Sequence, residues 1–556
     1  MTRTRTVVAT ALAMALALTL SPVASAAVSQ VAPKPNDPTK LVTPPSEYRV
    51  PPGHRLSGVQ VIGIGDRVAK VAAALRGHSP ISAAAYESGK SNWEVHWFDR
   101  SRTEIATAQI SDTTGRVLEA WTGIQIDWGM ARGYPGAFGR RVDALYVWLP
   151  LCLLFIAPFF DWRQPLRLLH LDLGMLLGFS VSLAFFNNAH IYASVPLAYP
   201  PLLYLLGRML WIGLRGRDLG TLRLSVPATW LGTAAIFLIG FRAALNVIDS
   251  NVIDVGYVSA LGASHVTSGA PLYGHFYASA VAGIDTYGPV TYEAYVPFNA
   301  VLGFNGRWGS VPSSHGASIA FDLLCIGLLF LIGRRIRGPT LGAALAYAWA
   351  AYPFTLFTMN SNSNDALVAA LLLGAVAVAS SAPARGAMVA LGALTKFAPL
   401  AVAPLMATHG LRDEPRRLRA LALFALAFAA AALIALWPVF AHSSLAEMWK
   451  RTVVNQTNRI SIFSVWGLYG GLGWVQTAVQ VAAAALALAL AFVRRREDVV
   501  GLAALTAAIV IAVQLGVTHW FYLYIPWFFG LAMVALLCRY TEPAAERPAI
   551  GVGHGA

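Results

Sequence analysis

Apolar runs separated by short polar segments recur along the last three quarters of the 556-residue chain. Most of these runs are about 20 residues long, which is enough for a helix to cross roughly 30 Å of hydrocarbon. We predict spans near residues 142–160, 168–187, 194–214, 225–247, 316–333, 340–358, 366–381, 420–441, 465–492, 498–517 and 519–538. The pattern therefore predicts a polytopic α-helical membrane protein with about 11 transmembrane helices.

One apolar interval, residues 386–407, does not fit a simple crossing, because Lys396, Pro399 and Pro404 interrupt it. A full crossing would also place the arginines between residues 412 and 419 outside, against the positive-inside rule. We therefore predict a re-entrant pair of half-helices that enters and leaves from the cytoplasmic side. Broken helices at membrane depth need surrounding protein or water, so Lys396 is expected to point into a polar cavity.

The N-terminal quarter has a different organisation. Residues 1–26 combine Arg3 and Arg5, an apolar core and a small-residue end, as in a secretory signal peptide; an uncleaved anchor is the alternative. Residues 27–54 are predicted to be a Pro-rich linker. Residues 55–135 are predicted to be a small α+β domain, with a helix at Asp66–Leu75, strands at Trp93–Phe98, Thr103–Ile110 and Arg116–Trp121, and a turn at Asp112–Gly115.

Composition and charge agree with a membrane protein. Only 12% of the residues are charged, about half the usual share of a soluble chain. The net charge of +14 comes from short basic clusters between the spans, which indicates membrane orientation and argues against a nucleic-acid partner. We expect a bacterial-type plasma membrane protein whose N-terminal domain is extracytoplasmic and whose residues 541–556 form a cytoplasmic tail. Cys152, Cys325 and Cys538 lie in apolar runs, so neither a disulfide nor a cysteine metal site is predicted.

The long outer loop, residues 249–315, carries the candidate chemistry. Asp249 and Asp254 stand at the outer end of a span, where a partly desolvated carboxylate would have a raised pKa and could abstract a proton. The alternative is structural: Asp249 caps a helix or pairs with Arg242, and Asp254 caps the next helix.

Four segments resemble the GT-C glycosyltransferase superfamily: Asp254–Ala263, Gly269–Tyr273, Asp285–Pro297 and Gly392–Pro399. The resemblance covers roughly residues 225–540 and is nearest to the polyprenyl-phosphate mannosyltransferase-like branch. The three predicted helices within 142–214 are additional to that pattern. Separately, Trp93–Trp97 and Asp112–Val117, which follow a helix, resemble a PepSY-type extracytoplasmic domain with regulatory or binding roles.

The GT-C resemblance implies an inverting transfer of a sugar, mannose in that branch, from a polyprenyl-phosphate donor to an envelope lipid or glycan acceptor. An outer-loop aspartate would be the general base: Asp254 first, Asp249 second and Asp285 third. Asp285 could instead orient a sugar hydroxyl or share a divalent cation, although the reaction requires no cofactor. Tyr287 and Glu293 are expected to contact substrate.

The remaining candidates are cations and polar side chains at the predicted outer face. Lys396 and Arg459 could bind the departing phosphate, and His519 could assist as an acid, a base or a phosphate ligand. Lys396 could instead be structural, and His519 could belong to an interfacial aromatic belt. Asn362 and Asn364 could line the sugar site, although Asn364 or Asp365 could simply cap a helix.

Two other classes of protein remain as alternatives. A secondary transporter or lipid-carrier transport protein would also have many spans and a broken segment, but no inverted repeat is evident. A PepSY-linked electron-transfer protein would need paired histidines for haem, whereas His170 and His519 lie near opposite faces.

Overall fold

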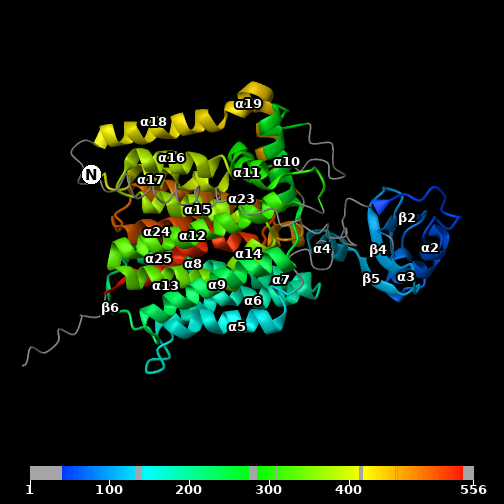
Figure 1. Cartoon of the computed structure of the whole chain (residues 1–556), viewed down its shortest axis with the longest axis horizontal. Helices are drawn as coiled ribbons and strands as arrows, with labels where there is room; N and C mark the ends of the chain where they lie inside the picture. Colours follow the sequence, from blue (N-terminus) through cyan, green and yellow to red (C-terminus); the bar gives the residue numbers. More distant parts are fainter. Residues whose placement is uncertain are drawn as a thin grey trace, which may run out of the picture.

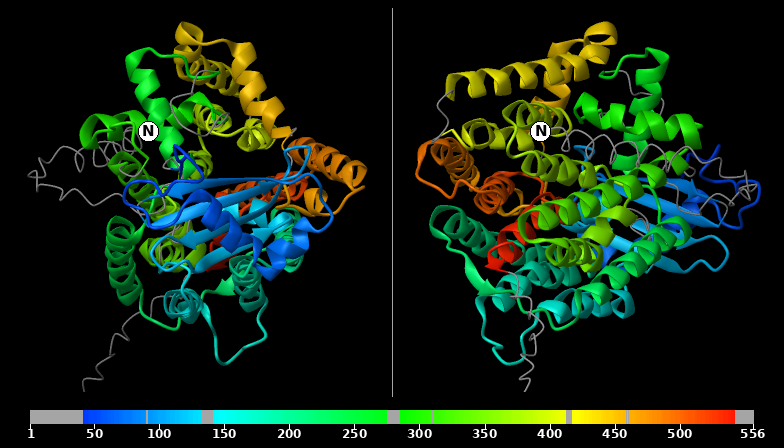
Figure 2. Two further views of the ribbon diagram at one scale, coloured as in Figure 1. Left: turned by 90° about the vertical axis from the view of Figure 1, so that its right-hand side faces the viewer. Right: turned by 60° about the vertical axis from the view of Figure 1, so that its left-hand side comes forward.

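The computed structural model describes residues 41–89, 91–132, 141–274, 285–308, 311–411, 417–457, 459 and 461–541. A small N-terminal domain lies across one end of a large bundle of helices (Figures 1 and 2). The predicted signal peptide, the first half of the predicted linker and all but the first residue of the predicted tail lie outside the described residues.

The N-terminal domain is a five-stranded antiparallel sheet in the order β1-β2-β3-β4-β5, with two helices on the side away from the bundle (Figure 1). Its elements are β1 (Leu41–Val42), α2 (Gly58–Asp66), α3 (Ala69–Leu75), β2 (Ser82–Ser88), β3 (Asn92–Phe98), β4 (Glu104–Ser111) and β5 (Val117–Thr122). Alternation along β3 buries Trp93, Val95 and Trp97 under the helices. Three strands lie within two residues of their predicted positions.

Three features of this domain differ from the prediction. The helix predicted at Asp66–Leu75 starts three residues later, as α3, and the preceding helix α2, which ends at Asp66, was not predicted. Strand β2 has an alanine-rich sequence without the expected alternation, and β1 lies inside the segment predicted to be a linker.

Helix α4 (Ile124–Arg132) joins the sheet to the bundle. The Trp128 indole N–H donates to the Phe186 carbonyl at 2.7 Å, and the Trp128 ring meets that of Trp121 edge-on. The face of the sheet that α2 and α3 leave uncovered therefore faces the bundle (Figure 1).

The bundle contains seven helices that are long and apolar enough to cross a membrane, within the described part of the chain. These are Leu168–Asn187, Ile191–Arg215, Ala228–Asp249, Pro312–Arg337, Arg417–Ala435, Gly473–Phe492 and Val499–Gly516. Shorter apolar helices occupy Leu145–Phe159, Asp365–Ala377, Ala398–Thr408 and Tyr522–Leu537. The chain is thus a polytopic membrane protein, and the number of 11 spans stays a prediction.

The helices of the bundle, in chain order, are α5 (Leu145–Ile156), η2 (Ala157–Phe159), α6 (Leu168–Asn187), α7 (Ile191–Leu197), α8 (Tyr199–Arg215), α9 (Ala228–Asp249), α10 (Asp254–Ser268), α11 (Pro289–Leu302), α12 (Pro312–Arg337), α13 (Pro339–Ala351), α14 (Pro353–Asn360), α15 (Asp365–Ala377), α16 (Ala382–Ala393), η3 (Ala398–Val402), α17 (Ala403–Thr408), α18 (Arg417–Ala435), α19 (Trp437–His442), α20 (Leu445–Trp449), η4 (Lys450–Val454), α21 (Asn455–Thr457), α22 (Val465–Leu468), α23 (Gly473–Phe492), α24 (Val499–Gly516), η5 (Tyr522–Tyr524) and α25 (Ile525–Leu537).

The predicted pair of half-helices is present as a hairpin made of α16 and η3–α17. Arg385, near the start of α16, donates to the carbonyls of Met406 and His409. The start of α16 and the end of α17, which are the two ends of the hairpin, therefore lie together. Helix α16 has 12 residues, or about 18 Å, which is too short for a crossing. The helix breaks between α16 and η3, and Lys396 lies in that break.

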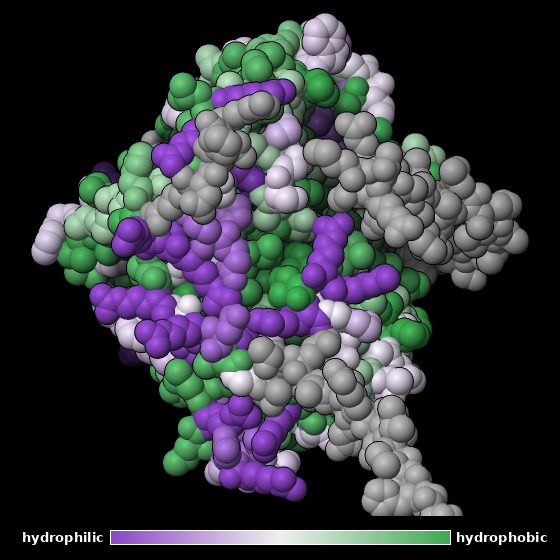
Figure 3. Space-filling view, turned by 90° about the vertical axis from the view of Figure 1, so that its left-hand side faces the viewer, coloured by the Kyte–Doolittle hydropathy of each residue, from purple (hydrophilic) through white to green (hydrophobic). Residues whose placement is uncertain are grey.

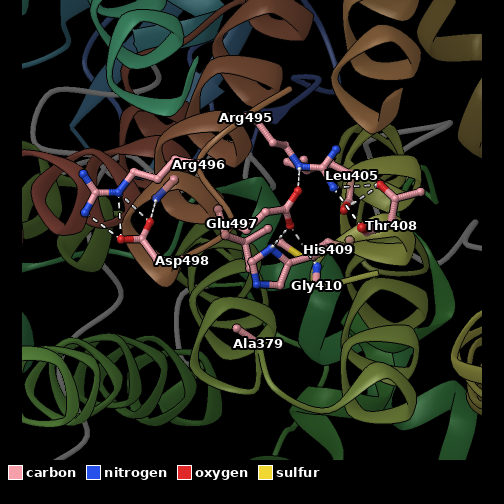
Figure 4. A network of polar contacts seen from close by, with 12 residues as sticks. Ala379, Leu405, Thr408, His409, Gly410, Arg495, Arg496, Glu497 and Asp498 are labelled. Carbon is pink, nitrogen blue, oxygen red and sulfur yellow. Dashed lines mark hydrogen bonds and ion pairs between the residues drawn. The ribbon is translucent and has the colours of Figure 1, made fainter. Parts of the chain in front are cut away.

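The two ends of the hairpin contact a charged network (Figure 4). Arg495 donates to the Thr408 carbonyl, Glu497 accepts from the Gly410 N–H, and Arg496 binds Asp498. Hydrophilic side chains gather on this end of the bundle (Figure 3), opposite the N-terminal domain. Arg337 and Arg496, which come from two of the basic clusters between the predicted spans, both bind Asp218, so these two clusters lie at the same end of the bundle.

Two buried ion pairs connect helices inside the bundle. Arg242 of α9 binds Asp322 of α12, and Asp172 of α6 binds Arg208 of α8. The alternative that Arg242 pairs with Asp249 is wrong, because its guanidinium donates to Asp322, Thr355 and the Ala350 carbonyl.

The additional helices α5–α8 are part of the same body. Tyr347 and Tyr352 donate to the carbonyls of Leu154 and Leu176, and Tyr352 stacks on Phe529 with ring centroids 3.9 Å apart.

Candidate functional site

Five charged or titratable side chains from separate segments share one region near the end of the bundle that carries the N-terminal domain. We call them the outer polar cluster, after the predicted outer loop that contains Asp254: Asp254, Asp365, Lys396, Arg459 and His519. The charges of Arg459 and Lys396 act on both Asp254 and His519. The structure thus brings together four predicted residues that are up to 265 positions apart in the sequence.

Asp254 is the first residue of α10, and the preceding turn holds it firmly. The Ile253 N–H donates to the Ser361 carbonyl at 3.2 Å. Gly256 permits the close approach of α10, because a Cβ there would lie 2.1 Å from the Asn362 carbonyl oxygen. The start of α10 therefore packs directly on the segment between α14 and α15.

The surroundings of Asp254 suit a general base. The residue is exposed, yet protein atoms crowd its carboxylate, and this partial loss of water raises its pKa above the ordinary value. The Val255 backbone N–H and the charges of Arg459 and Lys396 offset part of the rise. A carboxylate that is accessible but has a raised pKa can take a proton from a hydroxyl group.

Lys396 lies among three aromatic rings and one carboxylate. Its Nζ is 5.3 Å from the ring centroid of Tyr287, 5.5 Å from that of Tyr524 and 5.1 Å from that of Trp527. The same Nζ donates to Asp365 Oδ1 at 2.6 Å. The ammonium group therefore has a defined position, because cation–π contacts and an ion pair hold it together.

The start of α11 anchors the hairpin tip that carries Lys396. The N–H groups of Gly288 and Val290 donate to the carbonyls of Thr395 and Leu394, each at 3.1 Å. A Cβ at Gly288 would lie 1.9 Å from the Leu394 oxygen, so only glycine permits this contact. Tyr287, which precedes Gly288, consequently faces Lys396.

Arg459 and His519 complete the cluster. Arg459 is exposed, and its charge reaches Asp254, Tyr287 and His519. Burial first, and then the charges of Arg459 and Lys396, lower the pKa of His519 to about 3. His519 is therefore a neutral imidazole at ordinary pH, and its Nδ1 lies 2.9 Å from the Ser461 hydroxyl.

The predicted sugar contacts of Asn362 and Asn364 need correction, because both side chains are fully buried. The Asn362 amide donates to Ser250 Oγ and the Asn251 carbonyl and accepts from Asn246. The Asn364 amide donates to Ser259 Oγ at 3.2 Å. Neither amide reaches a surface, so both support the wall behind Asp254.

Asp285 is also engaged in a structural contact. Its carboxylate is buried, accepts the Gly274 N–H at 2.6 Å and lies 3.6 Å from Arg451. This arrangement suits a side chain that fixes the chain on both sides of residues 275–284, and it disfavours Asp285 as the base.

Asp249 and Glu293 are the other two candidate carboxylates. Asp249 ends α9 and has one buried oxygen without a hydrogen-bond partner among the described residues. Glu293 is half-buried on α11, and burial raises its pKa to about 7. Its roles in catalysis or binding stay predictions, as do those of Asp249.

A metal site is not evident in the described part of the chain, where no group of three or more His, Cys, Asp or Glu side chains is placed to hold an ion. The divalent cation considered as an alternative for Asp285 therefore has no ligand set among the described residues, and the expectation that no cofactor is required stays a prediction.

Part of the chain is similar to a known protein family. Residues 286–517 match the model of glycosyltransferase family 87. This is a membrane family of the GT-C type, so the match points to a glycosyltransferase. No curated protein and no solved structure matches the chain.

The family-87 region contains part of the outer polar cluster. Asp365, Lys396 and Arg459 lie inside residues 286–517, whereas Asp254 lies 32 residues before them and His519 two residues after them. The match therefore covers the cationic side of the cluster, and the candidate base precedes it in the chain.

Sequence reasoning missed three residues of the outer polar cluster and its surroundings: Asp365, Tyr524 and Trp527. Asp365 has the sequence context of a helix cap, but its carboxylate binds Lys396 and the Trp527 indole instead. Tyr524 and Trp527 belong to an aromatic run in an apolar span. The isolated lysine at 396 was the one available signal, because such a charge needs a partner at membrane depth.

Proposed function

We propose that this protein is an inverting glycosyltransferase that moves a sugar from a polyprenyl-phosphate donor to a hydroxyl group of an envelope lipid or glycan. The observation that supports the proposal most strongly is the outer polar cluster. One accessible carboxylate, two cations and one neutral imidazole share it, and the family match points to the same class of enzyme.

Asp254 is the proposed general base. Its carboxylate takes the proton of the acceptor hydroxyl while that oxygen attacks the anomeric carbon of the donor sugar. The bond between the anomeric carbon and the phosphate oxygen breaks, and the phosphate leaves with the electron pair. Attack opposite the leaving group inverts the anomeric configuration.

Lys396 and Arg459 are the proposed partners of the leaving phosphate. The bond that breaks leaves an additional negative charge on that phosphate, and fixed cations stabilise such a charge as it develops. The acceptor proton meanwhile neutralises Asp254, so the total charge of the site is unchanged by the reaction. His519 stays neutral and is suited to hydrogen bonding with the phosphate or the sugar.

The donor class follows from the same chemistry. A lipid phosphate as the leaving group needs no nucleotide site, and the membrane-embedded fold suits a lipid-linked substrate. Mannose is the sugar that the branch resemblance favours, and the outer face of a plasma membrane is the expected location.

The test uses purified protein in lipid nanodiscs with polyprenyl-phosphate mannose, polyprenyl-phosphate glucose and a nucleotide sugar as separate labelled donors. We expect transfer from one lipid-linked donor to an added glycolipid, with a product anomer opposite to that of the donor. Transfer from the nucleotide sugar alone, retention of configuration, or saturable solute uptake without transfer would contradict the proposal.

A further inference from the structure

Asp365 is a buried carboxylate for which the proposed reaction has no direct use. It is the first residue of α15 and is 1% exposed. Its Oδ1 accepts both the Lys396 ammonium at 2.6 Å and the Trp527 indole N–H at 3.0 Å. The helix N-terminus also favours a negative charge at this position.

Two effects of Asp365 on Lys396 can be separated. The first is geometric, because the carboxylate and the three aromatic rings together define where the ammonium lies. The second is electrostatic, because a buried charge is poorly screened and acts at full strength on its surroundings.

The charges of the cluster show what the second effect does. Asp254 and Asp365 balance Lys396 and Arg459, while His519 is neutral. A donor phosphodiester adds one negative charge, and the product phosphate monoester carries between one and two. Without Asp365 the cluster would have excess positive charge and would hold the lipid-phosphate product more tightly.

We propose that Asp365 is a positioning residue that also limits phosphate affinity: it places Lys396 for the phosphate and, as its counter-ion, lets the lipid phosphate leave after transfer. This inference rests on the proposed function, since it assumes that the phosphate meets Lys396. It assigns to Asp365 the balance between holding the donor and releasing the product.

Asp365→Asn tests the electrostatic effect with little change of shape. The amide oxygen still accepts a hydrogen bond from Lys396 or Trp527, but the negative charge is gone. Because a like charge within a few ångströms of a phosphate is removed, we expect the Kd of farnesyl phosphate to fall about ten-fold. We expect kcat to fall as well, with a burst of product in the first turnover, because release becomes slow.

Three further variants complete the experiment. Lys396→Gln should raise the same Kd about ten-fold. Asp172→Asn removes an equally buried, ion-paired carboxylate between α6 and α8 and should leave the Kd unchanged. Asp365→Ser is the second neutral variant, used if thermal unfolding shows that the asparagine variant is poorly folded, and it should also tighten binding.

The two hypotheses have separate outcomes. A Kd of farnesyl phosphate that is unchanged or higher than that of wild type in both neutral Asp365 variants would overturn the inference. A carboxylate with a merely structural role would not give tighter binding when it is removed. Wild-type protein that binds farnesyl phosphate but transfers no sugar from any lipid donor would overturn the proposed function. The effect of Asp365 on the Kd would still be decided in that case.

Discussion

Asn362 offers a sharp test of how the fold positions Asp254. Its backbone has a φ of 54°, in the left-handed region that asparagine tolerates better than most residues. Its side chain contacts Asn246, Ser250 and Asn251 at 2.7–2.9 Å. These contacts connect the end of α9 and the turn before Asp254 to the segment between α14 and α15.

The expected losses of stability and activity follow from those three hydrogen bonds. Removing the Asn362 amide deprives buried polar groups of partners, which costs about 2 to 4 kcal/mol of folding free energy. A displacement of the base by about 1 Å lowers the rate on the order of 100-fold. We therefore expect Asn362→Gly, which keeps the left-handed backbone accessible, to lower kcat about 10- to 100-fold. The donor KM should change little, because Lys396 and Arg459 are untouched.

Asn360 provides the matched control. It is equally buried, and neither side-chain atom has a partner among the described residues. Asn360→Ala should therefore leave kcat near the wild-type value. Steady-state transfer with both variants and their thermal unfolding midpoints are the assay. A stable Asn362→Gly variant with wild-type kcat would refute the positioning role.

Three other predictions follow from charges outside the reacting groups. Arg242→Leu leaves Asp322 with Trp349 as its remaining side-chain donor and should destabilise the bundle by about 3 to 5 kcal/mol, measured by denaturant unfolding in detergent. Although burial opposes it, hydrogen bonds and charges of Glu104 and Glu94 raise the pKa of His96 from 6.5 to about 9. Protonated His96 therefore stabilises the N-terminal domain by about 3 kcal/mol at most below pH 6.5, and this stabilisation is lost as the pH rises to about 9. Amide exchange of β3 in His96→Gln, compared with that in wild type, measures the stabilisation. Burial raises the pKa of Glu293 from 4.5 to about 7, so ionisation of the carboxylate destabilises the folded protein progressively as the pH rises through this range. Glu293→Gln should therefore be about 2 kcal/mol more stable than wild type at pH 8 but not at pH 4.

Each of these predictions has a contradicting result. A double variant with both Arg242 and Asp322 replaced by leucine that is no more stable than Arg242→Leu would deny a coupled pair. Equal protection of β3 in His96→Gln and wild type at pH 6 would deny the histidine contribution. A Glu293→Gln variant less stable than wild type at pH 8 would show that the carboxylate has a stabilising partner.

Much of the membrane architecture follows from local sequence. Apolar runs place most of the long helices within a few residues, although the span predicted at 340–358 divides into α13 and α14 and the one at 465–492 begins as α23 only at Gly473. A lysine with two prolines marks the hairpin tip, because a broken apolar segment has few other solutions in a membrane. The position of Asp254 at the start of a helix in the outer loop was also predictable from its flanking sequence.

The contacts that make the site were not predictable in this way. Gly288 meets Leu394 and Asp365 meets Lys396 only because α11, α15 and the hairpin tip come together in space. Asn362 and Asn364 were expected to face a sugar, since polar residues in an outer connection are normally solvated. Tertiary packing instead buries both of them against α9 and α10. The late start of α3 and the unpredicted helix α2 reflect the same limit, because a helical pattern does not show where one helix ends and the next begins.

The most direct test of the central claim compares Asp254→Asn with Asp249→Asn in transfer of a labelled sugar from polyprenyl phosphate. Both changes keep side-chain size and remove one carboxylate. Because the general base contributes about 100- to 10,000-fold, the account predicts that Asp254→Asn lowers kcat by at least about 100-fold while Asp249→Asn stays near wild type. Full activity of Asp254→Asn, or a loss confined to Asp249→Asn, would contradict it.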